Sequence, residues 1–156
     1  MFRDINSLLR DTEGFRKTIE IFEKRYKNAK IDAIAGIESR GFIIASILAS
    51  KLNKPLILIR KLGKLPFETI KEEYDLEYGK ASIEIQKDAI KWGQKVLVID
   101  DLIATGGTLN AACNLIEKLG ASVAEIAAVI DLPDLKGREK LEQKWSCFSI
   151  VSFEGE

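Results

Sequence analysis

Apolar residues along the first part of the chain recur with the period of an α-helix. Within residues 13–28, Phe15, Ile19, Phe22 and Tyr26 stand at spacings of four, three and four. That spacing places all four side chains on one face of an amphipathic helix. We therefore expect a surface helix here, with one face turned toward a core.

Shorter apolar runs predict strands that alternate with further helices. We expect buried strands at residues 31–36, 55–59 and 96–100, a last strand at 147–153, and helices at 42–53 and 107–119. Residues 122–130 fit either a strand or a strand followed by a turn, and 68–86 fit a hairpin or a mobile lid. The alternation predicts an α/β fold, a parallel sheet flanked by helices, in a single domain over residues 1–156.

Composition narrows the classes of function. The 156 residues carry 24 basic and 24 acidic side chains, so no net charge draws the protein to nucleic acid or to a membrane, and we expect neither as a partner. We find no long apolar span and no secretory start, and Cys113 and Cys147 are far apart, which favours the cytoplasm. The absence of histidine excludes Ser-His-Asp and Cys-His catalysis and His-based metal sites.

The segment VLVIDDLIATGGTL, residues 96–109, is the strongest chemical signal. Two adjacent acids, Asp100 and Asp101, end an apolar strand, and a loop of small residues opens the next helix. The loop consists of Ala104, Thr105, Gly106, Gly107 and Thr108. Glycines let backbone N–H groups converge, and a helix N-terminus favours an anion, so we expect a phosphate cradle. The segment contains neither a Walker A loop nor a GxGxxG dinucleotide fingerprint.

The aspartates beside this cradle indicate what carries the phosphate. Carboxylates accept hydrogen bonds from sugar hydroxyls and can hold Mg²⁺ through its water molecules, without a direct metal–protein cage. The order predicts a ribose 5-phosphate, with its hydroxyls on Asp100 and Asp101. The alternative is a strand-end turn with a solvated pair of aspartates and an ordinary Thr/Gly helix start.

This segment resembles the signature with which type I phosphoribosyltransferases bind 5-phosphoribosyl diphosphate (PRPP). Five further segments resemble the adenine phosphoribosyltransferases of that family: FRDI (2–5), IAGIESRGF (34–42), IRKLGKLP (59–66), LEYGKASIEIQKDAI (76–90) and LKGREKL (135–141). The resemblance implies a type I fold with a small hood and a flexible lid loop or hairpin. It also implies a homodimeric, Mg²⁺-dependent enzyme of purine salvage that transfers the phosphoribosyl group of PRPP to adenine, giving AMP and diphosphate.

The resemblance assigns the cations to the diphosphate. Ser39 and Arg40 match the diphosphate loop, Lys61 and Lys64 approach the same group, and Arg60 reaches the neighbouring subunit's site. Arg40 can grip an anion in bidentate fashion. The alternative is an ordinary charged turn followed by a solvated basic loop.

The lid carries the implied acid/base group. By the resemblance, Glu77 matches the general acid/base near the imidazole nitrogen of the base, with Tyr78 beside it. A carboxyl group under a closed lid loses water, which raises its pKa toward a value useful for proton transfer. The alternative is an exposed hairpin acid beside a packed Tyr78.

The resemblance implies that three residues bind the base: Phe2, Arg3 and Leu135. The alternative for Phe2 is an ordinary apolar anchor at the start of the chain. Asp4 would orient the first segment. Relatives carry an N-terminal helix and a Pro/Gly-containing segment before FRDI, so we expect a short hood segment here. Base affinity and specificity would suffer more from this than PRPP binding.

Two other functions remain open at this point. One is a phosphoribosyltransferase for guanine, xanthine or orotate. The other is a non-catalytic PRPP- or nucleotide-binding regulator on the same fold, although neither a helix-turn-helix module nor a basic stripe supplies it with a recognition surface.

Overall fold

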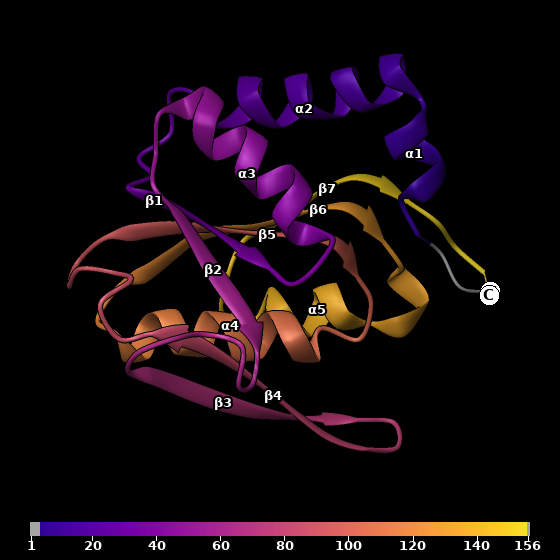
Figure 1. Cartoon of the computed structure of the whole chain (residues 1–156). Coiled ribbons are helices and arrows are strands. Elements are labelled where there is room, and N and C mark those ends of the chain that lie inside the picture. The colour runs from indigo at the N-terminus through magenta and orange to yellow at the C-terminus, as the bar shows by residue number, and fades with distance from the viewer. Residues whose placement is uncertain (1–3, 156) are drawn as a thin grey trace.

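The computed structural model describes residues 4–155, which form one sheet with helices on both faces (Figure 1). The elements run α1 (Asn6–Arg10), α2 (Thr12–Tyr26), β1 (Ala33–Ile37), α3 (Gly41–Leu52), β2 (Leu56–Lys61), β3 (Thr69–Leu76), β4 (Gly79–Gln86), β5 (Lys95–Ile103), α4 (Gly107–Lys118), β6 (Ser122–Asp131), the 3-10 turn η1 (Pro133–Leu135), α5 (Gly137–Leu141) and β7 (Cys147–Ser152). No helix within 4–155 has both the length and the apolar character that crossing a bilayer requires.

The sheet has the strand order β3-β4-β2-β1-β5-β6-β7. The strands β2, β1, β5, β6 and β7 are parallel, as expected. The β3–β4 hairpin pairs antiparallel within itself and with β2, so the whole sheet is mixed. Its two strands are joined by residues 77–78 alone, and a connection that short permits only antiparallel pairing.

Each face of the sheet is covered by its own apolar core. On one face Phe22 and Leu48 of α2 and α3 pack over Leu97 of β5. On the other, Leu115 of α4 packs against Val98 in a second cluster that also covers the base of the hairpin. Figure 1 shows α2 and α3 above the sheet and α4 and α5 below it. Parallel strands need this double cover, which explains their continuous apolar runs.

Two strand predictions need correction. The strand predicted to end at Asp100 continues to Ile103, because the long neighbour β6 goes on pairing with it as far as Asp131. The second strand was expected to be buried, but only Ile57 and Ile59 are. Leu56 and Leu58 are 37% and 39% exposed on the opposite face, because α3 packs chiefly over β1 and β5.

Candidate active site

The carboxyl ends of the parallel strands bring several of the predicted groups to one edge of the sheet. The chain leaves β1 toward β2 on one side and leaves β5 toward β6 on the other, so the strand order reverses between β1 and β5. Open α/β sheets bind ligands at such a reversal. The turn after β1 carries Ser39 and Arg40, and the end of β5 carries Asp100 and Asp101.

The predicted phosphate loop lies between β5 and α4. Gly106 caps α4 with a φ of 85°, a conformation that L side chains rarely adopt, and its carbonyl accepts from the N–H of Asn110 at 2.8 Å. The loop lines a small cavity together with Asp100 and Leu102. Backbone N–H groups of the first turn of α4 have no partner within the helix, so this end of the helix favours an anion.

The two aspartates differ in their surroundings. Asp101 is buried, whereas Asp100 is half-buried and accepts the N–H of Asp101 on Oδ1 at 2.8 Å. Burial, and then the charge of Asp101, hold the pKa of Asp100 well above its usual range. Two adjacent carboxyl groups at the end of a strand offer several oxygen acceptors, which suits a pair of sugar hydroxyls.

The turn after β1 is pressed against the aspartates. A Cβ added to Gly41 would lie 2.9 Å from the carbonyl oxygen of Ile99 and 3.1 Å from Oδ1 of Asp100. This close approach brings Nε of Arg40 to 2.8 Å from Oδ2 of Asp101. The structure thus joins one group predicted for diphosphate to one predicted for ribose.

The basic residues at the end of β2 and just after it gather around Glu38, a residue that the sequence interpretation did not single out. The carboxylate of Glu38 accepts from the backbone N–H of Lys61 at 2.8 Å and from Arg60 at 3.2 Å, and it lies 3.4 Å from Nζ of Lys64. Burial opposes ionisation of Glu38, but these partners outweigh it and lower its pKa. Glu38 stands directly before Ser39, but its partners lie more than twenty residues further along the chain, so no local pattern in the sequence indicated these contacts.

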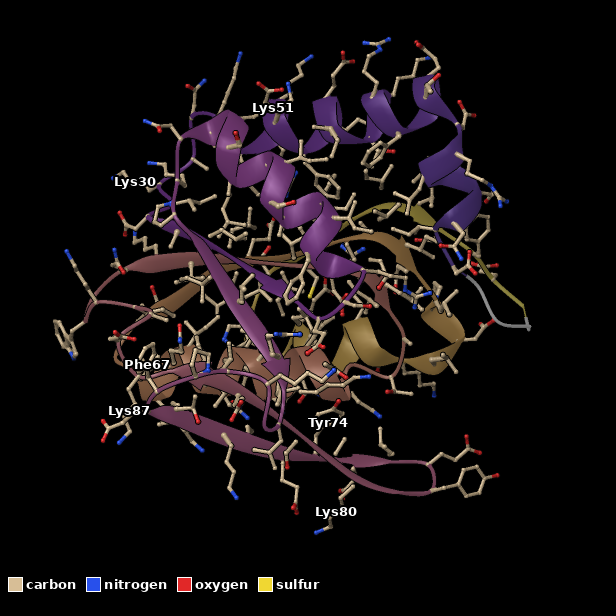
Figure 2. The ribbon with its side chains drawn as sticks, viewed as in Figure 1. Lys30, Lys51, Phe67, Tyr74, Lys80 and Lys87 are labelled. Carbon is tan, nitrogen blue, oxygen red and sulfur yellow. The ribbon has the colours of Figure 1, made fainter. Side chains whose placement is uncertain are left out.

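Glu77 and Tyr78 form the tip of the hairpin, and the structure does not bring them to the aspartates. Tyr78 is 91% exposed, and the tip projects beyond α5 (Figure 1). Nearer its middle, β3 is tied to α4 by an ion pair between Glu72 and Lys118. Figure 2 shows Tyr74 between the hairpin and the helices and Lys80 directed outward. The catalytic role of Glu77 and Tyr78 therefore stays a prediction that requires movement of the hairpin.

Of the three predicted base-binding residues, the structure describes only Leu135. Phe2 and Arg3 lie outside the described residues. Leu135 belongs to η1 and is 44% exposed, directly before the positive-φ residue Lys136. The next residue, Gly137, packs against the phosphate loop: a Cβ there would lie 2.1 Å from the carbonyl oxygen of Ala104.

Gly137 is thus a site residue that the sequence interpretation missed. It stands within the quoted LKGREKL segment, but a glycine in a short polar segment carries no sign of what it touches. The contact joins the segment after Leu135 to the loop at 104–106, so the two subsites are in direct backbone contact.

Comparison with known proteins places this geometry among its relatives. Residues 4–156 match the model of the phosphoribosyl transferase domain. The chain is 53% identical over 156 residues to the adenine phosphoribosyltransferase of Marinobacter nauticus, covering 99% of this chain and 87% of that protein. It is 55% identical over 155 residues to that of Butyrivibrio fibrisolvens, covering 99% and 85%.

Solved structures agree. The crystal structure of adenine phosphoribosyltransferase from Thermoanaerobacter pseudethanolicus superposes with a TM-score of 0.92 at 43% identity, covering 97% of this chain and 88% of that one. The Trypanosoma brucei enzyme in complex with AMP, pyrophosphate and ribose-5-phosphate superposes at 0.89 and 32% identity, covering 97% and 69%.

Proposed function

The chain belongs to the phosphoribosyltransferase family, and from that premise we propose that it transfers the 5-phosphoribosyl group of PRPP to adenine, releasing diphosphate and forming AMP. The observation that carries the proposal is the contact of Arg40 with Asp101 beside the Gly106 loop. Cation, sugar-binding acid and phosphate cradle stand together there, as a ligand with a phosphate at each end of a ribose requires. Full-length similarity to adenine phosphoribosyltransferases favours adenine over guanine, xanthine or orotate.

Different groups of site residues bind different parts of the substrate. The loop at 104–108 binds the 5-phosphate, and Asp100 and Asp101 accept the ribose hydroxyls. Ser39, Arg40, Lys61 and Lys64 bind the diphosphate, whose departure leaves a ribose carbon with oxocarbenium character. Cations that face the leaving group stabilise the charge that develops on it, while the fixed loop holds the ribose in line with the incoming base.

The base contacts complete the site. Leu135 covers one face of adenine, and backbone groups of Phe2 and Arg3 read its edge. Closure of the β3–β4 hairpin carries Glu77 and Tyr78 over the base and excludes water. Glu77 then takes the proton that the imidazole ring of adenine gives up as its nitrogen forms the new bond to the ribose.

Mg²⁺ fits these residues as a metal held mainly by the substrate. Within residues 4–155 no three His, Cys, Asp or Glu side chains are grouped so that they could hold a metal. Asp100 and Asp101 would contact Mg²⁺ through its water molecules, while the diphosphate supplies the direct ligands. The metal would neutralise charge on the leaving diphosphate.

The exposed face of β2 supports a homodimer. Leu56 and Leu58 are adjacent on that face, and both are exposed although β2 lies inside the sheet. A two-fold contact through this face would bury them and bring Arg60, on the same strand, toward the partner's site. We also place the protein in the cytoplasm, in keeping with its free cysteines, Cys113 and Cys147.

A matched assay tests the function. The purified protein is given PRPP and Mg²⁺ with adenine, guanine, hypoxanthine, xanthine or orotate, and nucleotide and diphosphate are separated by chromatography. We expect AMP from adenine and little product from the other bases. Product from another base alone would move the activity within the family, and PRPP binding without any product would favour the regulator.

A further inference from the structure

Glu84 of β4 is a buried carboxylate outside the site described above. It is 4% exposed and lies opposite Arg60 of β2 in the strand register. Its neighbours Ile83 and Ile85 point into the apolar core beneath the sheet, so Glu84 points to the other face, on which no helix within residues 4–155 packs closely against β4. What buries Glu84 is the loop between β2 and β3, residues 62–68.

Both oxygens of this carboxylate accept hydrogen bonds, one from the loop and the other from Thr69 at the start of β3. Oε1 accepts the backbone N–H groups of Gly63 at 3.2 Å and Leu65 at 3.1 Å. Oε2 accepts the hydroxyl of Thr69 at 3.1 Å. A further bond from Gln86 of the same strand face to the carbonyl of Pro66 extends the attachment. A buried carboxylate is costly unless it is bonded in this way, so the loop and Glu84 depend on each other.

This loop carries or adjoins the two lysines assigned to diphosphate. Lys64 stands between the two loop residues whose N–H groups Glu84 accepts, and Lys61 is the last residue of β2, directly before the loop. Glu38 contacts the cationic side chains of Arg60 and Lys64, which an arriving anion can take over. Two of the three bonds to Glu84 come from the loop backbone, so they can persist when the lysine side chains turn to a ligand.

We propose that Glu84 is a positioning residue for diphosphate binding, which holds the backbone of residues 63–65 so that Lys61 and Lys64 face the diphosphate. The inference rests on the proposed function, because that function places diphosphate at these lysines. It assigns Glu84 no contact with substrate. A pre-positioned loop spares the ligand the cost of ordering it, so the effect is on affinity.

The test separates the two ends of the substrate. Inorganic diphosphate with Mg²⁺ and, separately, AMP are titrated into the wild-type protein and into Glu84→Leu, Glu84→Gln and Glu68→Leu. We expect Glu84→Leu to weaken diphosphate binding roughly tenfold or more and to leave AMP affinity within about twofold. Glu84→Gln keeps an oxygen acceptor and should restore diphosphate affinity to within about threefold of wild type.

Glu68→Leu is the matched control, since it removes an acid from the same loop whose side chain is 84% exposed and pairs only loosely with Lys87 at 3.7 Å. It should bind both ligands as wild type does. Thr69→Val removes one of the three bonds to Glu84 and serves if Glu84→Leu does not fold. We expect it to weaken diphosphate binding about threefold.

Two outcomes would overturn the inference and leave the proposed function standing. One is unchanged diphosphate affinity in Glu84→Leu, or in Thr69→Val where that variant replaces it. The other is an equal loss of AMP and diphosphate affinity, which would mean general damage to the protein. A wild-type protein that binds neither ligand would overturn the proposed function and the inference with it.

Discussion

Nε of Arg40 lies 2.8 Å from Oδ2 of Asp101, joining the turn after β1 to the end of β5. A group assigned to diphosphate and a group assigned to ribose thus form an ion pair. Lysine would keep the charge and lose the planar fork with which arginine binds an anion. We expect Arg40→Lys to weaken diphosphate binding about tenfold, measured by calorimetry, while Tm moves by less than about 2 °C.

Arg16→Lys is the control for that variant, because Arg16 forms only exposed ion pairs on α2. Wild-type diphosphate affinity in Arg40→Lys would remove Arg40 from the diphosphate site.

Asp100 is expected to lower the stability of the folded protein at neutral pH while it contributes to ligand binding. Its raised pKa means that its favourable contribution exists below the ordinary value of 3.8 and is lost as pH rises through the higher folded value. Asp100→Asn keeps Oδ1 as acceptor for the N–H of Asp101 and removes the repulsion. We expect Tm to rise by about 2–4 °C at pH 7, with the gain vanishing near pH 4, while AMP binding weakens about tenfold.

Thermal unfolding across pH, with calorimetric titration of AMP, measures both effects. The exposed Asp88→Asn is the control and should change neither. A variant with lower Tm than wild type at neutral pH would contradict the claim that Asp100 destabilises the folded protein at that pH.

Gly137 is expected to reject any side chain. A Cβ there would lie 2.1 Å from the carbonyl of Ala104 and 2.8 Å from the nitrogen of Gly106, both backbone atoms that cannot move aside cheaply. We expect Gly137→Ala to destabilise the protein by about 2–3 kcal/mol in urea unfolding and to weaken AMP binding at least tenfold.

Gly14→Ala makes the same change in the first turn of α2. There the added Cβ meets only side-chain atoms of Asp11 and Leu8 at 3.2–3.3 Å. That variant should be close to wild type in both measurements. A Gly137→Ala protein that behaved likewise would show that the loop has room for the added methyl group.

Glu77 is expected to act in turnover and not in PRPP binding. It is exposed at the hairpin tip, and we assign it no contact with PRPP before the hairpin closes. Glu77→Gln should lower kcat about 10²-fold and leave KM for PRPP within about twofold in steady-state assays. Glu73→Gln, an exposed acid paired with Lys80 on the same hairpin, is the control. Unchanged turnover in Glu77→Gln would exclude it as the acid/base.

Leu58 is expected to lie in the dimer contact. Placing a charge on this face of β2 would leave it buried and unpaired in the dimer, so Leu58→Asp should sediment as a monomer where wild type sediments as a dimer. Ile21→Asp puts the same charge on an exposed apolar position of α2 and should not change the sedimentation. A wild-type monomer, or a dimeric Leu58→Asp, would remove β2 from the interface.

Periodicity and local chemistry in the sequence determined the architecture and the principal loop. The helix with Phe22 on its buried face, the helix that starts at Gly107, and the glycine loop that leads into that helix were predictable because each depends on residues close together in the chain. The resemblance in separate segments also identified the family, which the comparison over residues 4–156 confirms.

Only the tertiary structure decided which of these segments meet. The contacts of Arg40 with Asp101, Gly137 with Ala104, and Glu84 with Gly63 join residues from different elements. The exposure of Leu58 likewise depends on how far α3 extends over the sheet. Hydrophobic patterning records whether a residue is apolar and with what period it recurs. It does not record which neighbour stands opposite, because that is set by strand order and by the packing of helices on the sheet.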